Sequence, residues 1–369
     1  MNSVKFLNSV KFSQFFPAIF LMFMGTVGSG IFVLPYLFSQ SNFIFASVFL
    51  VFLTIITAVL NQFYVAIVTT TAGDHQLSGY AQKYLGHRFG LLASLNLLIL
   101  AFGAILAYSK LFSGFTLVVF PNFSIYLISF LYLLIIFVLF YFHQILSKNI
   151  FLLIPIFILV VPIFLYFYSF NYPLLTINYS LSITPSFSFF GPLLFALSGF
   201  TIIPEVRETL GTPKKLSLVV TLGLLLVAII YFLFAFSIIR LSGDSLNIDS
   251  VTGLATSFPL LAKLIAIFGM VITLRSTVNF MVILRELFYR DLKVSLPIAN
   301  LLPSLFPLLG LLLTTVSLLT VISLTGHFTI FVSALVICLI RLRLPHSFWT
   351  EFWAILIMLT LTLGLVIAL

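Results

Sequence analysis

The stretch Gly28–Tyr36 reads GSGIFVLPY and lies inside an otherwise apolar segment of the chain. In a helix interior, glycine costs about 1 kcal/mol relative to alanine and proline costs about 3 kcal/mol. A helix that crosses a membrane has no water to satisfy the backbone groups that such residues set free. The stretch therefore predicts a helix that is interrupted within the membrane and turns its free peptide groups toward a polar cavity or a ligand.

The composition is that of a membrane protein. Of the 369 residues, 62% are hydrophobic and 7% are charged, whereas a soluble domain carries about 25% charged residues. We expect an all-α polytopic membrane protein with no cofactor, no bound metal and no nucleic-acid partner. The net charge of +9 does not indicate nucleic acid, because the lysines and arginines fall in short loops between apolar segments. The single cysteine, Cys338, excludes a disulfide within the chain.

Apolar windows of about 20 residues predict eleven membrane spans. The expected spans are residues 14–38, 43–69, 89–119, 123–142, 150–171, 186–206, 216–240, 257–289, 297–320, 325–342 and 347–368. With a cytoplasmic N-terminus, 13 of the lysines and arginines lie in cytoplasmic segments and two, Arg240 and Lys263, lie in outside loops. This asymmetry supports both the count and the orientation, and it puts the C-terminus outside. Residues 1–13 are expected to form a basic segment at the cytoplasmic surface, and residues 71–88 a surface helix.

The pattern of the opening stretch recurs in LSGFTIIPE, residues Leu197–Glu205. Ser29-Gly30 precedes Pro35 by the same spacing as Ser198-Gly199 precedes Pro204, and the two copies are 169 residues apart. The spans that contain them are five spans apart, so they run through the membrane in opposite directions. Matched interruptions of this kind indicate an inverted repeat, here residues 14–171 and 186–342, followed by an extra span within 343–369. Packing contacts between helices are the alternative reason for such small residues.

The two interruptions offer opposite chemistry. At the first, a half-helix begins near Ser29 and Gly30, so its free N–H groups and positive dipole end suit a carboxylate. At the second, a half-helix ends near Ala196–Ser198, so its free carbonyls suit an ammonium group or a cation. Donor and acceptor ends that face each other predict a receptor for a zwitterion such as an α-amino acid.

These motifs resemble those of the amino acid–polyamine–organocation superfamily of transporters, whose members have the LeuT-like fold of two inverted five-helix repeats. Within it, GDHQLSGYAQKYLG (residues 73–86) and FGAILAY (residues 102–108) are most similar to tyrosine/tryptophan and related aromatic amino acid permeases. The resemblance implies a substrate site made of Gly28, Ser29, Gly30, Ile31, Tyr108, Ala196, Leu197, Ser198, Phe200 and Thr201. The first four would bind the substrate's carboxylate, and Ala196–Ser198 would hold its amino group. Phe200 would cover the site, and Tyr108 would either contact substrate or be an ordinary membrane aromatic.

Ionisable groups within spans are candidates for coupling transport to an energy source. In sodium-coupled members of this fold, small hydroxyl residues at the place of Ser276 and Thr277 help to bind sodium. Arg275 stands beside them, and it would act as a fixed cation near the carbonyls of residues 25–27. The alternative is a structural arginine that caps carbonyl groups.

A proton-coupled transporter also needs a group that titrates, which arginine does not supply. Glu205 is the first candidate for the proton carrier, with an inner-gate salt bridge as its alternative role, and Lys110 is the second candidate. Glu208 and Glu286 are expected to pair with Arg207, Arg285 or Arg290 near the cytoplasmic interface. The predicted coupling and gating residues are therefore Arg275, Ser276, Glu205 and Lys110.

We expect a secondary transporter in the cell membrane that takes up a neutral or aromatic amino acid with a proton by alternating access. An amino acid exchanger, a polyamine or cationic amino acid carrier and a non-transporting sensor are the alternatives. A membrane-embedded enzyme is disfavoured, since the sequence has no HExxH motif, nucleophile elbow or metal-spaced histidine cluster. A metal-ion carrier is disfavoured because the first span has no carboxylate. The sequence makes no prediction of oligomeric state.

Overall fold

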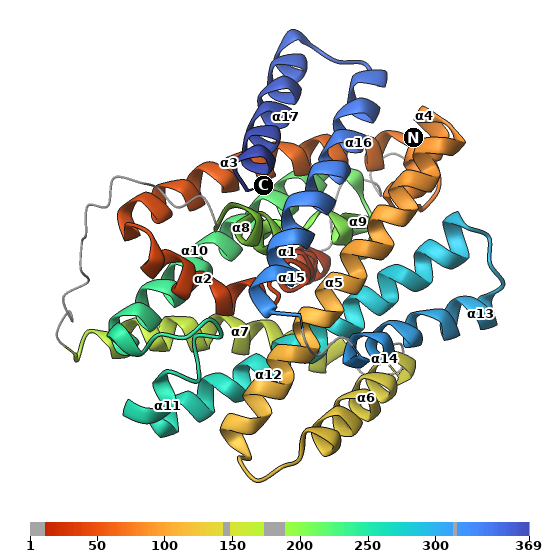
Figure 1. The fold of residues 1–369 in the computed structure, drawn as a ribbon. Helices are drawn as coiled ribbons and strands as arrows, with labels where there is room; N and C mark the ends of the chain where they lie inside the picture. The colour runs from red at the N-terminus through yellow and green to blue at the C-terminus, as the bar shows by residue number, and fades with distance from the viewer. Residues whose placement is uncertain (1–11, 143–147, 173–188, 313–315, 369) are drawn as a thin grey trace.

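In the computed structural model, the residues described are 12–142, 148–172, 189–312 and 316–368. The basic segment expected at residues 1–13 therefore falls almost wholly outside them, as do the first three residues of the sixth expected span. The described chain is helical and contains no β-strand (Figure 1). Its α-helices are α1 (Phe12–Thr26), α2 (Gly30–Gln40), α3 (Phe43–Thr70), α4 (Leu77–Leu85), α5 (His87–Val119), α6 (Ile125–Phe142), α7 (Lys148–Ser169), α8 (Phe190–Leu197), α9 (Ile203–Leu210), α10 (Leu216–Ser242), α11 (Leu254–Ser257), α12 (Pro259–Glu286), α13 (Leu296–Leu301), α14 (Leu305–Leu312), α15 (Leu318–Leu324), α16 (Ile330–Arg343) and α17 (Phe348–Ala368). Short 3₁₀ or π segments join several of them, including η3 (Phe200–Ile202), η6 (Leu287–Asp291) and η8 (Thr325–Thr329).

Among the described residues, seven helices are long and apolar enough to cross a membrane, or eight if α1 and α2 count as one bent span. The other three expected spans coincide with shorter or interrupted helices, namely α7, α8 with α9, and α13 with α14. The chain is thus a multi-pass helical membrane protein, and the exact number of spans stays a prediction.

The boundary expected between the ninth and tenth spans is wrong. Residues 318–320 belong to the tenth span, because one apolar helical segment runs from Leu318 to Arg343. Ser317 begins it as an N-cap, since its hydroxyl accepts a hydrogen bond from the Thr320 N–H at 3.1 Å. The preceding segment is shorter than expected and is divided at Leu302–Ser304, where Pro303 enters a 3₁₀ turn.

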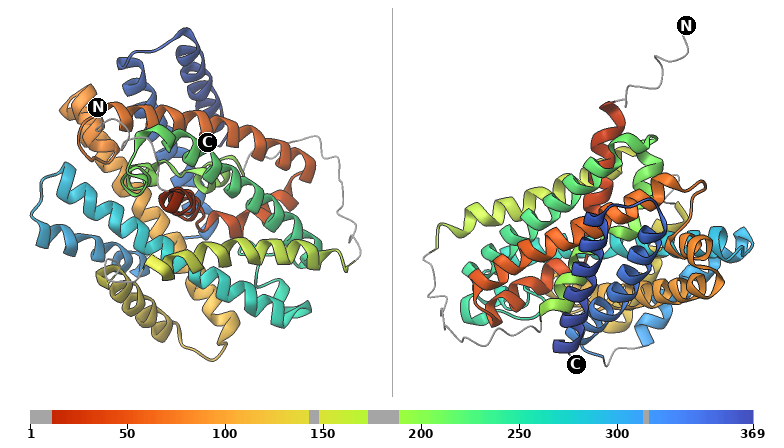
Figure 2. Two further views of the ribbon diagram at one scale, coloured as in Figure 1. Left: turned by 180° about the vertical axis from the view of Figure 1, so that it is seen from behind. Right: turned by 90° about the horizontal axis from the view of Figure 1, so that it is seen from above.

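The first helix occupies the middle of the bundle. Figure 2 shows α1 nearly end-on with other helices around it, while α16 and α17 form a hairpin at one edge. The end of α1 is correspondingly buried, since Met22, Phe23, Thr26 and Val27 are all buried. Residues near the end of α1 are therefore surrounded by protein and not by lipid.

A helix is present within residues 71–88, as expected, namely α4, and it is anchored by a side chain distant in the sequence; its place at the membrane surface stays a prediction. Asp291, at the end of η6, accepts hydrogen bonds from the N–H groups of Gln76 (3.2 Å) and Gly79 (3.0 Å) and from the Ser78 hydroxyl. Its other oxygen contacts His75 Nδ1 at 3.1 Å. This carboxylate satisfies the free donors at the start of α4 and complements the helix dipole.

Candidate functional site

The first interruption lies at Val27–Ser29, where the sequence analysis expected it. The helix before it ends with a bond from the Val27 N–H to the Phe23 carbonyl (2.9 Å), and α2 leaves at an angle of 57°. The N–H groups of Ser29, Gly30 and Ile31 donate to no described atom. The Ser29 hydroxyl is fully buried and likewise has no described partner. Unpaired donors and a buried hydroxyl thus gather at the start of α2.

The second interruption follows Leu197. The backbone N–H and hydroxyl of Ser198 both donate to the Phe195 carbonyl, at 3.3 and 2.7 Å, and the Gly199 N–H donates to the Leu197 carbonyl at 2.9 Å. A 3₁₀ turn then leads into α9, where Pro204 stands in the first turn, a position that needs no backbone donor. The carbonyl end of α8 is thereby partly satisfied by its own loop.

The two interruptions touch each other. A Cβ atom added to Gly30 would lie 2.8 Å from the Ala196 Cα and still closer to its Cβ. A Cβ added to Gly199 would lie 3.1 Å from the Thr26 Cβ and collide with its hydroxyl. Glycine is required at Gly30 because the N-terminus of α2 meets the end of α8. It is required at Gly199 because the loop after α8 meets the end of α1.

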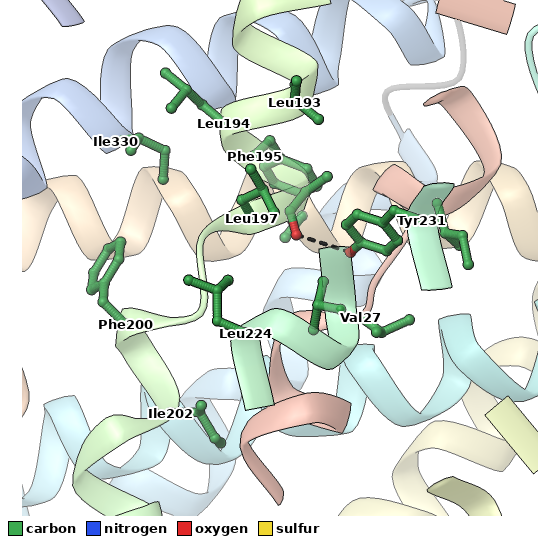
Figure 3. Close-up of a cluster of buried hydrophobic side chains, with 14 of the residues drawn as sticks. Val27, Leu193, Leu194, Phe195, Leu197, Phe200, Ile202, Leu224, Tyr231 and Ile330 are labelled. Atoms are coloured by element: carbon green, nitrogen blue, oxygen red, sulfur yellow. Dashed lines mark hydrogen bonds between the residues drawn. The ribbon is translucent and has the colours of Figure 1, made fainter. Parts of the chain in front are cut away.

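Tyr231 of α10 joins the two interruptions directly. Its hydroxyl donates to the Ala196 carbonyl at 2.9 Å and also lies 3.3 Å from the Thr26 carbonyl. Figure 3 shows the ring between Val27 and Leu197, with its hydroxyl directed at the end of α8. The sequence analysis missed this residue. The available signal was weak, since Tyr231 is simply the one tyrosine in an apolar helix.

Tyr108 and Ser276 lie on the other side of the first interruption. A Cβ on Gly28 would be 2.7 Å from the Tyr108 oxygen, so this phenol is directly beside the break. The Tyr108 hydroxyl interacts with that of Ser276, which in turn donates to the Val27 carbonyl at 3.3 Å. The structure thus brings Tyr108 and Ser276 of the expected set to the first break, together with Gly28.

Phe200 and Thr201 are both buried in the 3₁₀ turn after the second interruption. The Phe200 ring packs edge-on against Tyr64 of α3, with ring centres 6.3 Å apart. Its expected role as a cover over a substrate stays a prediction, and so does a substrate role for Thr201.

The expected coupling residues are spread over three elements. Glu205, on α9, accepts a hydrogen bond from the Gln76 side chain at 3.3 Å, and its other oxygen is buried without a described partner. Arg275 is half-buried on α12, next to Ser276, and the charge of Glu205 acts on it. The contact from α12 to the break carbonyls comes from Ser276, so the expected bracing by Arg275 stays a prediction. Lys110 is partly exposed on α5, two residues beyond Tyr108.

The predicted pairing of Glu208 and Glu286 is confirmed. Arg290 contacts both carboxylates at 2.5 Å, and Glu286 also contacts Arg285 at 2.6 Å. The Glu208–Arg290 pair ties α9, which follows the second interruption, to η6, directly after α12. Glu205 forms no ion pair within 4.0 Å among the described residues, so the structure does not show the inner-gate salt bridge that was its alternative role.

The arrangement of the helices is similar to that of membrane proteins of known structure. A manganese transporter of Eremococcus coleocola, in one mutant form, is similar with a TM-score of 0.70 and 12% identity, covering 95% of this chain and 85% of that one. The same transporter in complex with an aromatic bis-isothiourea substituted compound gives 0.71 and 12%, covering 96% and 85%. MhsT in complex with L-phenylalanine gives 0.65 and 17%, covering 95% and 98%.

These likenesses establish the LeuT-like transporter fold expected from the sequence. The neighbour whose function is named is a transporter, in agreement with the prediction that this chain is no enzyme. No protein-family model and no curated protein sequence matches the chain. The special closeness to aromatic amino acid permeases therefore stays a prediction.

Proposed function

We propose that the chain is a secondary active transporter that carries amino acids across the cell membrane by alternating access. The observation that carries the proposal is the meeting of two interrupted helices of opposite polarity. At one place in the protein interior, α2 begins with unpaired donors and α8 ends with carbonyls. An amino acid carries the complementary pair of groups, a carboxylate and an ammonium, on one carbon atom.

Three of the four expected donors, the N–H groups of Ser29, Gly30 and Ile31, are unpaired in the observed conformation, whereas that of Gly28 interacts with the Tyr231 hydroxyl. The N–H groups of Gly28, Ser29, Gly30 and Ile31 would bind the carboxylate, assisted by the buried Ser29 hydroxyl. A helix N-terminus favours an anion through both its free N–H groups and its dipole. Gly30 contacts Ala196 here, so the amino group of a substrate would reach the Ala196 carbonyl only when the two breaks separate.

The acceptor end is occupied by protein donors. The Ala196 carbonyl accepts from Tyr231 and the Leu197 carbonyl accepts from Gly199. The Ala196 carbonyl would exchange its phenol donor for the ammonium group, while the Leu197 carbonyl has a second lone pair for it and the Ser198 carbonyl would assist. Tyr108 lies beside Gly28 and would contact the bound substrate.

A neutral amino acid suits this site better than a cationic one or a polyamine. The described residues of the two breaks, 25–31 and 195–202, include no acidic and no basic side chain. A substrate with an extra positive charge would bury that charge without a partner, which is costly. An aromatic side chain is the finer expectation from the resemblance, and the complex of MhsT with L-phenylalanine is in line with it.

Proton coupling through Glu205 is the second part of the proposal. This carboxylate lies just past the break, and one of its oxygens is buried without a described partner. An unpaired buried carboxylate favours its protonated form, so Glu205 would bind a proton when enclosed and release it when exposed to the cytoplasm. The orientation with a cytoplasmic N-terminus belongs to the same proposal.

Manganese transport is the competing function, because the manganese transporter shares the fold. The described residues include no group of three or more histidine, cysteine, aspartate or glutamate side chains that could hold a metal ion. The first break offers a serine hydroxyl instead of a carboxylate. The site chemistry therefore favours an amino acid over a divalent metal.

Uptake into proteoliposomes tests the proposal. Initial rates are measured for the twenty labelled protein amino acids and for Mn²⁺, with and without an inward pH gradient, beside empty liposomes. We expect saturable uptake of one or more neutral amino acids, raised by the gradient. Uptake that needs unlabelled amino acid inside the vesicles and ignores the gradient would identify an exchanger, and uptake of Mn²⁺ alone would refute the proposal.

A further inference from the structure

Tyr231 bonds to the carbonyl groups of both interrupted helices. Its side chain is fully buried, and its hydroxyl donates to the carbonyl oxygen of Ala196 at 2.9 Å and to that of Thr26 at 3.3 Å. These two residues lie at the ends of α8 and α1, which are 35 and 205 positions away from Tyr231 in the sequence. One phenol therefore holds together the two helix ends that enclose the site, and Figure 3 shows its bond to the end of α8.

The helix that carries Tyr231 makes this contact specific. It runs without interruption for 27 residues, from Leu216 to Ser242. The carbonyls of Thr26 and Ala196 instead belong to chain segments whose regular bonding stops at these residues. A firm helix thus presents a donor to two ends that would otherwise have unsatisfied acceptors in the protein interior, which is costly.

We propose that Tyr231 is a latch that occupies the place of the substrate's amino group while the site is empty. The proposal rests on the proposed function, in which the Ala196 carbonyl receives that group. An ammonium group has three donors and a full charge, and a charge-assisted hydrogen bond is about twice as strong as a neutral one. Arrival of the amino group therefore displaces the phenol, which releases the bridge between α1 and α8. A molecule with a carboxylate but no amino group fills the donor end and leaves the latch closed.

The latch lowers the affinity for substrate, because substrate must break it in order to bind. The apparent dissociation constant equals the intrinsic constant divided by the fraction of protein in which the latch is open. If the bridge is worth one ordinary hydrogen bond, its removal strengthens binding about fivefold, which is about 1 kcal/mol. A tyrosine whose hydroxyl merely supported the site would have the opposite effect, since its removal would weaken binding.

Tyr231→Phe removes the hydroxyl and keeps the ring, so the variant should pack as the parent does. Tyr132→Phe is the matched control. Tyr132 is equally buried, and its hydroxyl bonds to the Thr277 hydroxyl at 2.7 Å, between α6 and α12. Both variants lose one buried tyrosine hydroxyl, but only the first loses the bridge between the two breaks.

The first measurement uses no ligand. Hydrogen exchange of the protein in lipid nanodiscs is followed by mass spectrometry over peptides that cover residues 23–34 and 193–203. Tyr231→Phe should raise the exchange rate of both segments about fivefold or more, whereas Tyr132→Phe should leave both at the parental rate. Parental exchange of either segment in Tyr231→Phe would overturn the latch.

The second measurement tests the competition. The twenty protein amino acids are screened for binding to the parent, and the tightest is titrated beside the carboxylic acid that lacks only its α-amino group. Tyr231→Phe should tighten binding of the amino acid about fivefold and leave the affinity for the amine-free acid unchanged. Unchanged or weaker binding of the amino acid would refute the competition. If no amino acid binds to the parent, the proposed function and the competition both fail, and hydrogen exchange alone decides whether the bridge exists.

Discussion

Replacing Gly30 with alanine should block the closed conformation of the site. The new methyl group would lie 2.8 Å from the Ala196 Cα, whereas ordinary contact begins at 3.4 Å. The backbone of α8 would therefore have to retreat by roughly 0.6 Å or more, and a backbone atom cannot turn aside as the end of a long side chain can. Overpacking of this kind costs about 1–3 kcal/mol, which corresponds to a loss of roughly 5- to 150-fold in the population of the closed state.

The assay is the initial rate of amino acid uptake into proteoliposomes, together with the thermal unfolding temperature of the purified protein. Gly30→Ala should lower both. Gly114→Ala is the matched control, because the added methyl group in α5 would meet only an Asp249 oxygen at 3.9 Å. This control should keep the parental rate, and its stability should rise slightly, since alanine is favoured over glycine within a helix.

A double substitution separates a steric cause from other effects. Ala196→Gly in the Gly30→Ala background removes the methyl–methyl collision but leaves the contact with the Ala196 Cα, so the rescue should be partial. Parental uptake and stability of the single Gly30→Ala variant would refute the reasoning. Such a result would mean that α2 and α8 do not approach each other in any state that transport requires.

Three further substitutions test the coupling groups and the surface helix. Glu205→Gln should abolish the stimulation of uptake by a pH gradient while substrate still binds, and an unaltered pH dependence of uptake would exclude Glu205 as the proton carrier. Arg275→Thr should lower uptake tenfold or more at any sodium concentration, because a fixed cation is lost; sodium-independent uptake at the parental rate would show that Arg275 is not needed. Asp291→Ala should lower the free energy of unfolding by about 3 kcal/mol, since it leaves several donors at the start of α4 without their charged acceptor. A thermal unfolding temperature equal to that of the parent would contradict this assignment.

The local signals in the sequence located the interruptions well. Ser29-Gly30 and Ser198-Gly199 lie at the observed breaks, because glycine and proline act on the backbone of their own segment. The surface helix α4 and the pairing of Glu208 and Glu286 were also predictable, from polar residues in short loops of a chain that has few charges. The boundary near Thr320 was missed because a run of leucines looks the same on either side of a helix start, and the decisive feature is the Ser317 cap.

The role of Tyr231 could not be predicted from local sequence patterns. Its own segment marks it as an ordinary buried aromatic, and nothing nearby in the sequence needs its hydroxyl. The role appears only when α10 crosses the ends of α1 and α8 and brings the phenol to carbonyls 205 and 35 residues away. The Asp291 cap on α4 was missed for the same reason, since its partners lie more than 200 residues earlier in the chain.

The sequence alone determined that this chain belongs in a membrane, where its two interrupted helices break, and which polarity each broken end presents. These properties follow from hydropathy and from backbone preferences that act within a few residues. Only the tertiary structure decided that the broken ends meet, that one tyrosine joins them and that the carbonyl side is already occupied. Such contacts depend on how the helices cross, and the crossing is set by side-chain packing between segments that are far apart along the chain.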